Sequence, residues 1–423
     1  MNKYPAYHIT HIFFNNQFTL PATGESNKGN YLVFWWKDIA LGQLFVEPNE
    51  TFSQKEFYEA VVKAVAPSID FYATGKKGVT QDEWQNLLLN GQFTGLAAWM
   101  DILFKQWENV HVPASVPVSL IICTRNRVPD LKRCLQMLDE LTCRPAEIIV
   151  VDNNPSDIST ETLVATFKSV TYLKEPRAGL SFARNTGILH AGHPFIAFTD
   201  DDATVHPLWI YHLYETFRDS SVAAMTGLVI SLQLETGAQA IFEKHWTFNK
   251  GYTDIRYDNE YFKANYKIGV PVWEIGAGVN MAFRRSIFDE IGLFDERLGA
   301  GASGCSEDSE VWFRILLKGY AMHYNPRAIV YHEHRKDMPG LKKQIFSYMR
   351  GFTAAALFQQ QYHPESGYKI FKLRGFIKQY SYALIKQFPH YPLQYKTLLP
   401  EIKGVLSGLL FYYKNKKKPG GFK

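Results

Sequence analysis

The stretch Val118-Ser-Leu-Ile-Ile-Cys-Thr-Arg-Asn-Arg127 joins a short apolar run to a polar turn. An apolar run of this length is typical of a strand that a sheet buries on both faces. Similar runs follow it, separated by segments with helical spacing, and such alternation predicts a parallel sheet with right-handed crossovers. The further strands are expected at Glu147–Asp152, Val170–Leu173 and Phe195–Phe198, and the helices at Pro129–Leu141 and Leu180–Ala191.

Polar segments directly follow three of these strands. They are Thr124–Arg127, Asp152–Asn154 and Asp200–Asp202. Ligands of open α/β sheets bind beyond the carboxyl ends of the strands. We therefore expect the three segments to share one binding site.

The third segment is a run of three aspartates, Asp200, Asp201 and Asp202. Carboxylates this close repel one another and raise one another's pKa, and a bound divalent cation relieves that repulsion. Mg²⁺ and Mn²⁺ prefer carboxylate oxygens and bridge readily to phosphates. An acidic, solvated loop is the other interpretation of the triplet by itself. Its position after a buried strand favours a ligand site.

The composition is that of an ordinary globular protein, with 46% hydrophobic and 21% charged residues in a chain of 423. This length allows two or three domains. No apolar run approaches the roughly 18 residues of a membrane span, and the amino terminus lacks a signal-peptide pattern. The four cysteines show no metal-ligand spacing, so a cytoplasmic protein with reduced thiols is expected.

The pattern changes along the chain and predicts three domains. Residues 1–112 indicate a small α+β domain with a docking or accessory role, with two strands in Tyr31–Val46 and a helix after the capping-box pair Ser53 and Glu56. Residues 113–340 hold the alternating strands and helices.

The third predicted domain, residues 341–423, is a basic, aromatic-rich helical C-terminal extension. From Tyr368 to Lys423 the chain has twelve Lys and Arg residues and one acid, Glu401. A basic and aromatic segment suits an anionic membrane surface. A solvated basic helix that packs on the main domain is the other interpretation, and nucleic acid is not expected as a partner.

Residues 117–335 resemble glycosyltransferase family 2, the inverting nucleotide-sugar enzymes with the GT-A fold. Val118–Arg127 looks like the family's first strand and base-binding turn, and Ile148–Asp157 like its second strand, where an acidic residue reaches the nucleobase or ribose. Gly179–Gly187 resembles the helix that leads to the metal motif, and Phe198–Asp202 occupies the DxD position. The resemblance implies a Rossmann-like, mostly parallel sheet flanked by helices.

Three downstream segments agree with the resemblance. Gly276–Ser286, with Ile291–Asp295 after it, looks like the acceptor-side segment. Ser306–Glu310 resembles the acidic "ED" motif that supplies the base, and Val330–His334 the strand-end histidine of the metal or diphosphate site. Asn153 is a departure, because the family often has a second aspartate there; an amide donates as well as accepts, which leaves the base preference open.

The resemblance implies a role for each acidic residue of the triplet. A Mn²⁺ or Mg²⁺ ion held by Asp202, with Asp200 and His332 as further ligands, would bridge the phosphates of a nucleotide diphosphate sugar. Asp201 is expected to hydrogen-bond ribose or donor sugar, since adjacent side chains diverge. A UDP-sugar is favoured as the donor.

Asp308 is the expected catalytic base, with Glu307 beside it in the first turn of a helix. Ser306 is expected to cap that helix, and the helix dipole favours an ionised carboxylate that can accept a proton. Simple stabilisation of the helix by first-turn acids is the other interpretation.

The donor site is expected to include several arginines, because guanidinium groups suit phosphates and bases. Surface charge is the other interpretation, and placement at strand ends favours Arg127 and Arg177 over the rest. The predicted donor-binding residues are Thr124, Arg125, Arg127, Asp152, Asn153, Arg177, Arg184, Asp200 and Asp201.

These observations predict an inverting glycosyltransferase that acts on a glycan or lipid-linked acceptor in polysaccharide or cell-surface glycan biosynthesis, at the inner face of the cytoplasmic membrane. A nucleotidyltransferase is one alternative, but Thr124–Arg127 lacks the glycine of a phosphate loop. A nucleotide-sugar or glycan-binding module without catalysis is the other. It would be expected to lack Asp202, Asp308 or His332, and all three are present.

Overall fold

The computed structural model describes residues 5–15, 17–22, 27–76, 80–108, 110–369, 373–386, 388 and 396–420. Parts of the predicted N-terminal domain and C-terminal extension therefore lie outside the described residues. The chain forms two compact units. The first combines Met1–Val112 with Ser231–Asp254 and Glu333–Asp337; the second holds Pro113–Ile230, Ile255–His332 and Met338–Lys423.

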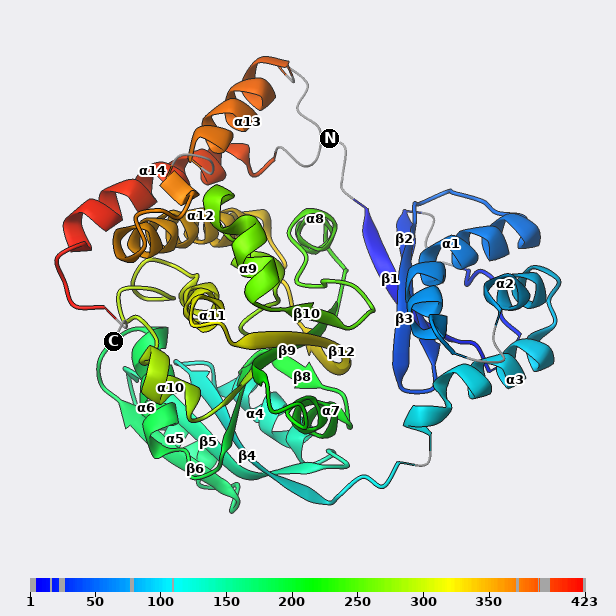
Figure 1. The fold of residues 1–423 in the computed structure, drawn as a ribbon, viewed down its shortest axis with the longest axis horizontal. Coiled ribbons are helices and arrows are strands. Elements are labelled where there is room, and N and C mark those ends of the chain that lie inside the picture. The colour runs from blue at the N-terminus through cyan, green and yellow to red at the C-terminus, as the bar shows by residue number, and fades with distance from the viewer. Residues whose placement is uncertain are drawn as a thin grey trace. The chain divides into compact units, whose positions relative to one another are not determined.

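The first unit has a small sheet in the order β1-β2-β3, in which β1 runs parallel to β2 and β2 antiparallel to β3 (Figure 1). The hairpin predicted in Tyr31–Val46 is present, and Lys37 in its turn has a φ of 51°. The predicted capping box of Ser53 and Glu56 begins α1. The elements are β1 (Ala6–Phe13), β2 (Lys28–Trp36), β3 (Ile39–Val46), α1 (Gln54–Ala73), α2 (Gln81–Leu89), α3 (Phe93–Phe104) and α8 (Gly237–His245).

The second unit is built on a larger sheet in the order β10-β12-β9-β11-β7-β4-β5-β6, with β8 paired to β12. Its strands are β4 (Ser115–Thr124), β5 (Arg144–Asn153), β6 (Val170–Glu175), β7 (Phe195–Asp200), β8 (Ala203–Val205), β9 (Val222–Ser231), β10 (Ile255–Tyr257), β11 (Met281–Arg284) and β12 (Ala321–His332). Its helices before the C-terminal region are α4 (Val128–Leu138), α5 (Ser159–Val164), α6 (Leu180–His190), α7 (Trp209–Thr216), α9 (Asn259–Asn265), α10 (Ile287–Ile291) and α11 (Glu307–Leu317).

The predicted α/β fold class is confirmed. Strands β7, β4, β5 and β6 are neighbours and all parallel, and helices flank the sheet. The predicted strands and helices of this region are all present, each with bounds within a few residues of those expected. Strands β4, β5 and β7 each contain a buried apolar run, as expected for parallel strands that are covered on both faces.

The antiparallel strands of this sheet were not predicted. Strand β11 pairs antiparallel with both β7 and β9, and β12 pairs antiparallel with β8. These pairings join segments far apart in the sequence, which periodicity alone does not reveal. The last of them sets His332 opposite Ala203, directly after the aspartate run.

The C-terminal region is helical, as predicted. It contains α12 (Met338–Tyr362), α13 (Leu373–Lys386) and α14 (Leu398–Asn415), and α12 and α14 lie side by side (Figure 1). None of the helices in the described part of the chain combines the length and apolar character that crossing a bilayer requires.

Candidate functional site

The carboxyl ends of three parallel strands bring the predicted polar segments together. In the pairing of β4 with β5, Thr124 lies opposite Asp152. In the pairing of β4 with β7, Cys123 lies opposite Asp200. One edge of the sheet therefore carries the ends of all three segments, as expected from the topology.

Asp201 is held from two sides. The Thr124 hydroxyl donates to Oδ2 at 2.7 Å, and Arg127 Nη1 donates to Oδ1 at 2.6 Å. Burial raises the pKa of Asp201 to about 7, although the positive charge of Arg127 opposes that shift. Both of its oxygens are occupied by protein donors, so this carboxylate connects β4 to the aspartate run.

Asp200, Asp202 and His332 form the metal-binding candidate. One ligand atom from each lies within 4.8 Å of the others. His332 Nε2 is 3.4 Å from Asp202 Oδ1, and Arg127 Nη2 donates to Asp202 Oδ2 at 2.8 Å.

The electrostatics of this cluster fit a cation. Burial acts to raise the pKa of Asp202, but His332 and Arg127 outweigh it and lower the pKa well below its usual range. Burial and the neighbouring charge of Asp202 raise the pKa of Asp200. Two carboxylates and an imidazole are a donor set that suits Mn²⁺, and the carboxylates suit Mg²⁺. The residues present therefore fit the ion that the sequence predicts.

Asp152 is buried at the end of β5 with one oxygen unpaired. The Tyr172 hydroxyl donates to Oδ2 at 3.1 Å, and no described residue donates to Oδ1. Burial raises the pKa of this carboxyl group. A buried acceptor without a donor is costly in a folded protein and points to a ligand. The hydrogen bond from Tyr172 was not foreseen, and the spacing of residues along the sequence gives no signal for it.

The other predicted donor-site residues are placed differently. The amide group of Asn153 forms hydrogen bonds with the backbone. Its Nδ2 donates to the carbonyl of Arg177 at 2.7 Å, and its Oδ1 accepts from Gly179 N at 2.9 Å. Arg177 forms a two-bond ion pair with Glu175, at 2.9 and 2.7 Å. Arg125 lies exposed in the turn after β4. The structure thus gives Asn153 and Arg177 partners within the protein, and their predicted part in donor binding stays a prediction.

Arg184 is buried on α6 and contacts two acidic groups. Its Nη1 donates to Glu307 Oε1 at 2.6 Å, and its Nη2 lies 4.0 Å from Asp200 Oδ1. Burial, together with the neighbouring charge of Asp308, raises the pKa of Glu307 to about 7 against the opposing charge of Arg184. No described residue donates to Glu307 Oε2. A buried guanidinium therefore joins the aspartate run to the start of α11.

Asp308 lies beside Glu307 in the first turn of α11. Its Oδ1 accepts from the backbone N–H of Ser309 at 2.6 Å. Gly278 faces its other oxygen: a Cβ at that position would lie 2.9 Å from Asp308 Oδ2 and 3.0 Å from Arg184 Nη2. A side chain at Gly278 would fill the space in front of both groups. Gly278 was not among the predicted site residues, although it belongs to the predicted acceptor-side segment.

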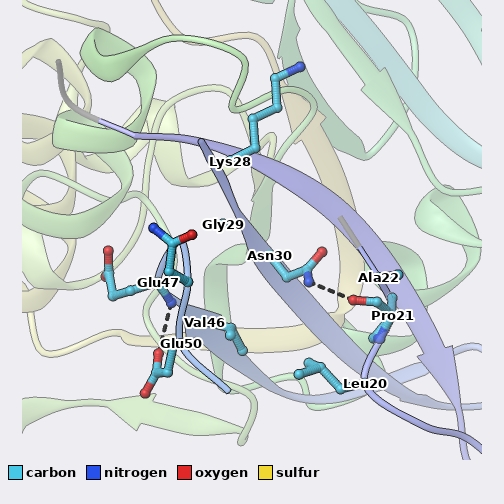
Figure 2. Close-up of a pocket in the computed structure, with 10 residues that line it drawn as sticks. Leu20, Pro21, Ala22, Lys28, Gly29, Asn30, Val46, Glu47 and Glu50 are labelled. Atoms are coloured by element: carbon cyan, nitrogen blue, oxygen red, sulfur yellow. Dashed lines mark hydrogen bonds between the residues drawn. The ribbon is translucent and has the colours of Figure 1, made fainter. Parts of the chain in front are cut away.

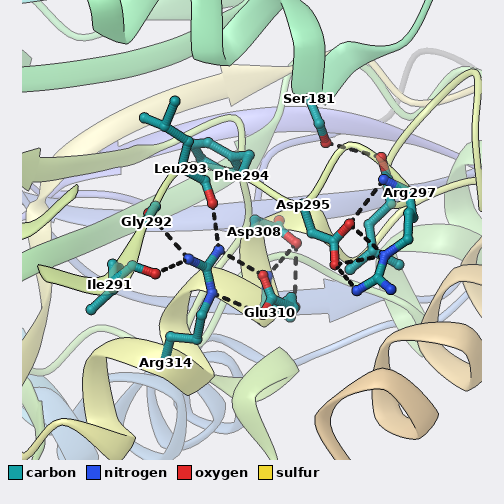
Figure 3. Close-up of polar contacts among 12 residues, drawn as sticks. Ser181, Ile291, Gly292, Leu293, Phe294, Asp295, Arg297, Asp308, Glu310 and Arg314 are labelled. Carbon is teal, nitrogen blue, oxygen red and sulfur yellow. Dashed lines mark hydrogen bonds and ion pairs between the residues drawn. The ribbon is translucent and has the colours of Figure 1, made fainter. Parts of the chain in front are cut away.

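Figure 3 shows two buried ion pairs, one within the helix that carries Asp308 and one in the segment before it. Arg314 binds Glu310 at 2.8 and 2.7 Å and donates to the backbone carbonyls that precede the helix. Asp295 and Arg297 form the second pair. The predicted side-chain cap by Ser306 is wrong, because this residue has a left-handed φ of 69° and its hydroxyl makes no cap hydrogen bond.

The second histidine of the Val330–His334 motif belongs to the first unit, outside the site. His334 Nε2 lies 3.0 Å from Glu243 Oε2, and its ring contacts Phe242. Strand β12 ends at His332, so His334 lies beyond the strand.

The first unit also has a polar hollow of about 310 Å³, shown in Figure 2. The Asn30 amide donates to the carbonyl of Pro21 at 2.9 Å on one side, and the Glu47 backbone donates to Glu50 at 2.8 Å on another. None of the predicted site residues lines it.

The comparisons with known proteins agree with the site. A family model described as glycosyl transferase family 2 matches residues 119–292. This part of the chain is therefore similar to glycosyl transferase family 2. The match includes the strands that end at Thr124, Asp152 and Asp200, and the mostly parallel sheet flanked by helices agrees with the GT-A fold that the resemblance implies.

Curated relatives carry related names. The chain is 27% identical over 229 residues to the pre-mycofactocin glycosyltransferase of Mycobacterium tuberculosis, a match that covers 53% of this chain and 44% of that one. It is 27% identical over 273 residues to the succinoglycan biosynthesis protein ExoM of Rhizobium meliloti, covering 60% of this chain and 78% of ExoM. The chain thus spans less than half the length of the mycobacterial relative.

Two solved structures were also compared. The mannosyltransferase PcManGT of Pyrobaculum calidifontis, in complex with GDP-Man and Mn²⁺, has a TM-score of 0.48 at 16% identity, covering 72% of this chain and 92% of that one. Staphylococcus aureus TarS in complex with UDP-GlcNAc has a TM-score of 0.42 at 14% identity, covering 69% and 82%.

Proposed function

We propose that this protein is an inverting glycosyltransferase that moves a sugar from a nucleotide diphosphate to a hydroxyl group of a glycan or lipid-linked acceptor. The similarity to family 2 and the names of the relatives support a transferase. Asp200, Asp202 and His332 would hold a Mn²⁺ or Mg²⁺ ion, which supplies charge stabilisation to the diphosphate leaving group when bound.

The observation that carries this proposal is the position of Arg184 between two groups of acids. One nitrogen of its guanidinium is 4.0 Å from Asp200 and another is 2.6 Å from Glu307, the neighbour of Asp308. A cation-binding cluster and a helix-borne carboxylate therefore lie around one buried side chain. Glycosyl transfer needs this combination, because the leaving group gains negative charge while the acceptor hydroxyl loses a proton.

The chain's own residues divide the chemistry between them. Asp308, in the first turn of α11, accepts the proton of the acceptor hydroxyl. Direct attack by that hydroxyl then inverts the configuration of the sugar. Asp152, with its unpaired buried oxygen, binds the nucleoside part of the donor, for which UDP is favoured. Arg184 holds Glu307 against Asp308 and so positions the base.

The name of one relative bears on the acceptor, and the charge of the C-terminal region bears on the place of action. The name of ExoM supports a polysaccharide or cell-surface glycan as the product. The twelve basic residues in Tyr368–Lys423 support peripheral association with an anionic membrane at its cytoplasmic face.

A donor screen tests the proposal. UDP-, GDP- and dTDP-sugars are added with and without Mn²⁺, and thermal stabilisation and sugar release are measured. We expect one nucleotide class to raise the melting temperature in a Mn²⁺-dependent manner, since a ligand that binds only the folded state stabilises it. Asp202→Asn should remove the Mn²⁺ dependence.

Asp139→Asn is the matched control, because Asp139 is an exposed aspartate at the end of α4. It should keep the full response to Mn²⁺. If no nucleotide sugar binds with or without the metal, the proposed function is wrong.

A further inference from the structure

Helix α14 has an inner face that packs tightly on α12. A Cβ at Gly404 would lie 2.6 Å from the carbonyl oxygen of Phe346, and one at Gly408 would lie 2.6 Å from that of Arg350. Only glycine allows the two backbones to approach this closely. The inner face of α14 is therefore fixed, and the opposite face points away from α12.

The outer face of α14 is a row of exposed large apolar side chains. Leu399, Leu406, Leu410 and Tyr413 are 62%, 56%, 63% and 60% exposed. Their spacing repeats at three, four and seven residues, which places them on one side of a helix. Single exposed leucines are common on protein surfaces, but a continuous row marks an interaction surface.

Helix α13 extends the same kind of surface. It packs against α14 through a small core of Tyr380, Ala383 and Leu398. Its outward side chains include Ile377 and Ile385, which are 69% and 73% exposed. Two neighbouring helices thus share an apolar core and both leave large apolar side chains exposed.

The charges around these side chains are all positive. Lys403, Lys414 and Lys417 are exposed on α14 and just beyond it. Glu401, the single acid after residue 365, is engaged inside instead: Thr397 donates to its carboxylate at 2.7 Å, and Tyr380 hydrogen-bonds to it. The outer surface therefore combines apolar and basic groups without a carboxylate.

We propose that the outer face of α13 and α14 binds an anionic lipid bilayer, with the helices lying in the plane of the interface. The leucines and isoleucines would enter the boundary between headgroups and acyl chains, and the lysines would contact lipid phosphates. The charge complementarity selects this partner over an uncharged apolar one. The binding goes beyond glycosyl transfer, since it requires neither donor nor metal.

The layers beneath this face connect it to the candidate base. Helix α12, which carries α14 on one side, contacts the segment before α11 on another: a Cβ at Gly351 would lie 2.5 Å from the carbonyl oxygen of Cys305. Asp308 follows Cys305 by three residues. Only helix α12 therefore lies between a bilayer bound at α14 and the segment that leads to Asp308. This short separation would bring a lipid-linked acceptor near the base, an argument that rests on the proposed function.

Vesicle co-sedimentation of the full chain tests the inference. Vesicles of equal parts phosphatidylglycerol and phosphatidylcholine are compared with phosphatidylcholine alone, at low and high salt. We expect binding to the anionic vesicles that weakens with salt. The double variant Leu406→Glu, Leu410→Glu should reduce binding at least about tenfold, and Lys414→Gln or Lys417→Gln about fivefold each.

The controls are Leu189→Glu, a leucine on α6 that is 67% exposed, and Lys132→Gln, an exposed lysine on α4. Both should bind vesicles as the unchanged protein does. Equal binding to neutral and anionic vesicles, no vesicle binding, or no effect of the leucine variants would each overturn the inference. Concentration-dependent dimers in sedimentation equilibrium that the leucine variants abolish would assign the face to a second copy instead. Donor binding is measured separately, so failure here would remove the proposed membrane association and leave the proposed glycosyl transfer standing.

Discussion

In the first unit the buried carboxylate of Glu243 is surrounded by donors, whereas in the second unit the buried carboxylates at the strand ends crowd one another. Glu243 Oε2 accepts from Ser231 at 2.7 Å and lies 3.0 Å from His334 Nε2. Its Oε1 accepts from Thr247 at 3.2 Å and from Tyr31 at 3.3 Å. Each oxygen therefore has two partners.

Several acids of the second unit, at the strand ends and at the start of α11, lack this balance. No described residue donates to Asp152 Oδ1 or Glu307 Oε2, and Asp200–Asp202 places three carboxylates in sequence. Buried acids with a full set of donors hold a fold together, while buried acids short of donors or close to other acids mark sites that a ligand completes. The number of donors around a buried carboxylate thus distinguishes structural acids from candidate functional acids, independently of the family's sequence motifs.

The strongest test of this comparison is Asp308→Asn. We expect transfer to fall about 10²- to 10⁴-fold, the usual contribution of a general base, with donor binding nearly unchanged. Turnover and the donor dissociation constant are measured in parallel. Asp289→Asn, which changes an exposed first-turn acid of α10, is the control and should keep full activity. Loss of donor binding together with activity would assign Asp308 to the donor site, and unchanged transfer would remove it from the mechanism.

Glu243→Gln tests the other side of the comparison. The amide accepts fewer hydrogen bonds and places its NH2 donor either against Ser231 or against Thr247, so we expect the free energy of unfolding to fall by about 2–4 kcal/mol. Thermal or urea unfolding measures the change. Glu235→Gln, at an exposed glutamate near the start of α8, should leave stability unchanged. A loss of activity with unchanged stability would contradict a structural role for Glu243.

Asp152→Asn sharpens the distinction within the second unit. If the unpaired oxygen serves a ligand, the free nucleotide should bind about tenfold more weakly, by roughly 1.4 kcal/mol. The melting temperature of the protein alone should change little, because the lost acceptor had no protein partner. Calorimetric titration with the nucleoside diphosphate gives the affinity. A large loss of stability with unchanged nucleotide affinity would instead assign Asp152 a structural role like that of Glu243.

The smallest expected effect concerns Glu175, a satisfied acid near the site. Hydrogen bonds from Arg177 hold its pKa at about 2, although burial opposes them. Because the folded pKa lies below the unfolded value, the stabilising contribution is present above about pH 4.3 and is lost as pH falls toward 2. Arg177 is largely exposed, so the contribution is about 1 kcal/mol or less. The stability difference between the unchanged protein and Glu175→Gln should therefore shrink from pH 7 to pH 3, and a difference that grows would contradict the assignment.

The sequence predicts the parallel part of the sheet because its strands β4, β5 and β7 contain apolar runs that end in polar turns. Thr124, Asp152 and Asp200 were therefore correctly expected at one edge. The antiparallel strands carry no such signal, since a strand such as Met281–Arg284 has only four residues and pairs with segments more than fifty residues away.

Within the site, residue types predicted which side chains lie close together. They did not predict which hydrogen bonds and ion pairs these side chains form. Arg127 and Arg184 were expected as donor contacts, and each forms ion pairs with protein carboxylates. The backbone role of Asn153 depends on the path of the loop near Gly179. Such pairings are set by tertiary geometry, which local spacing does not contain.

The first unit is assembled from three separate segments of the chain, and this affects how it can fold during synthesis. Strand β1 pairs at Tyr7 with Leu234, and Tyr31 reaches Glu243, which in turn needs His334. A nascent chain can form the β2–β3 hairpin early, but the buried polar cluster around Glu243 stays incomplete until residue 334 has left the ribosome. Domains usually fold in the order in which they emerge. Here the unit that begins the chain can only finish folding after most of the transferase domain has been made.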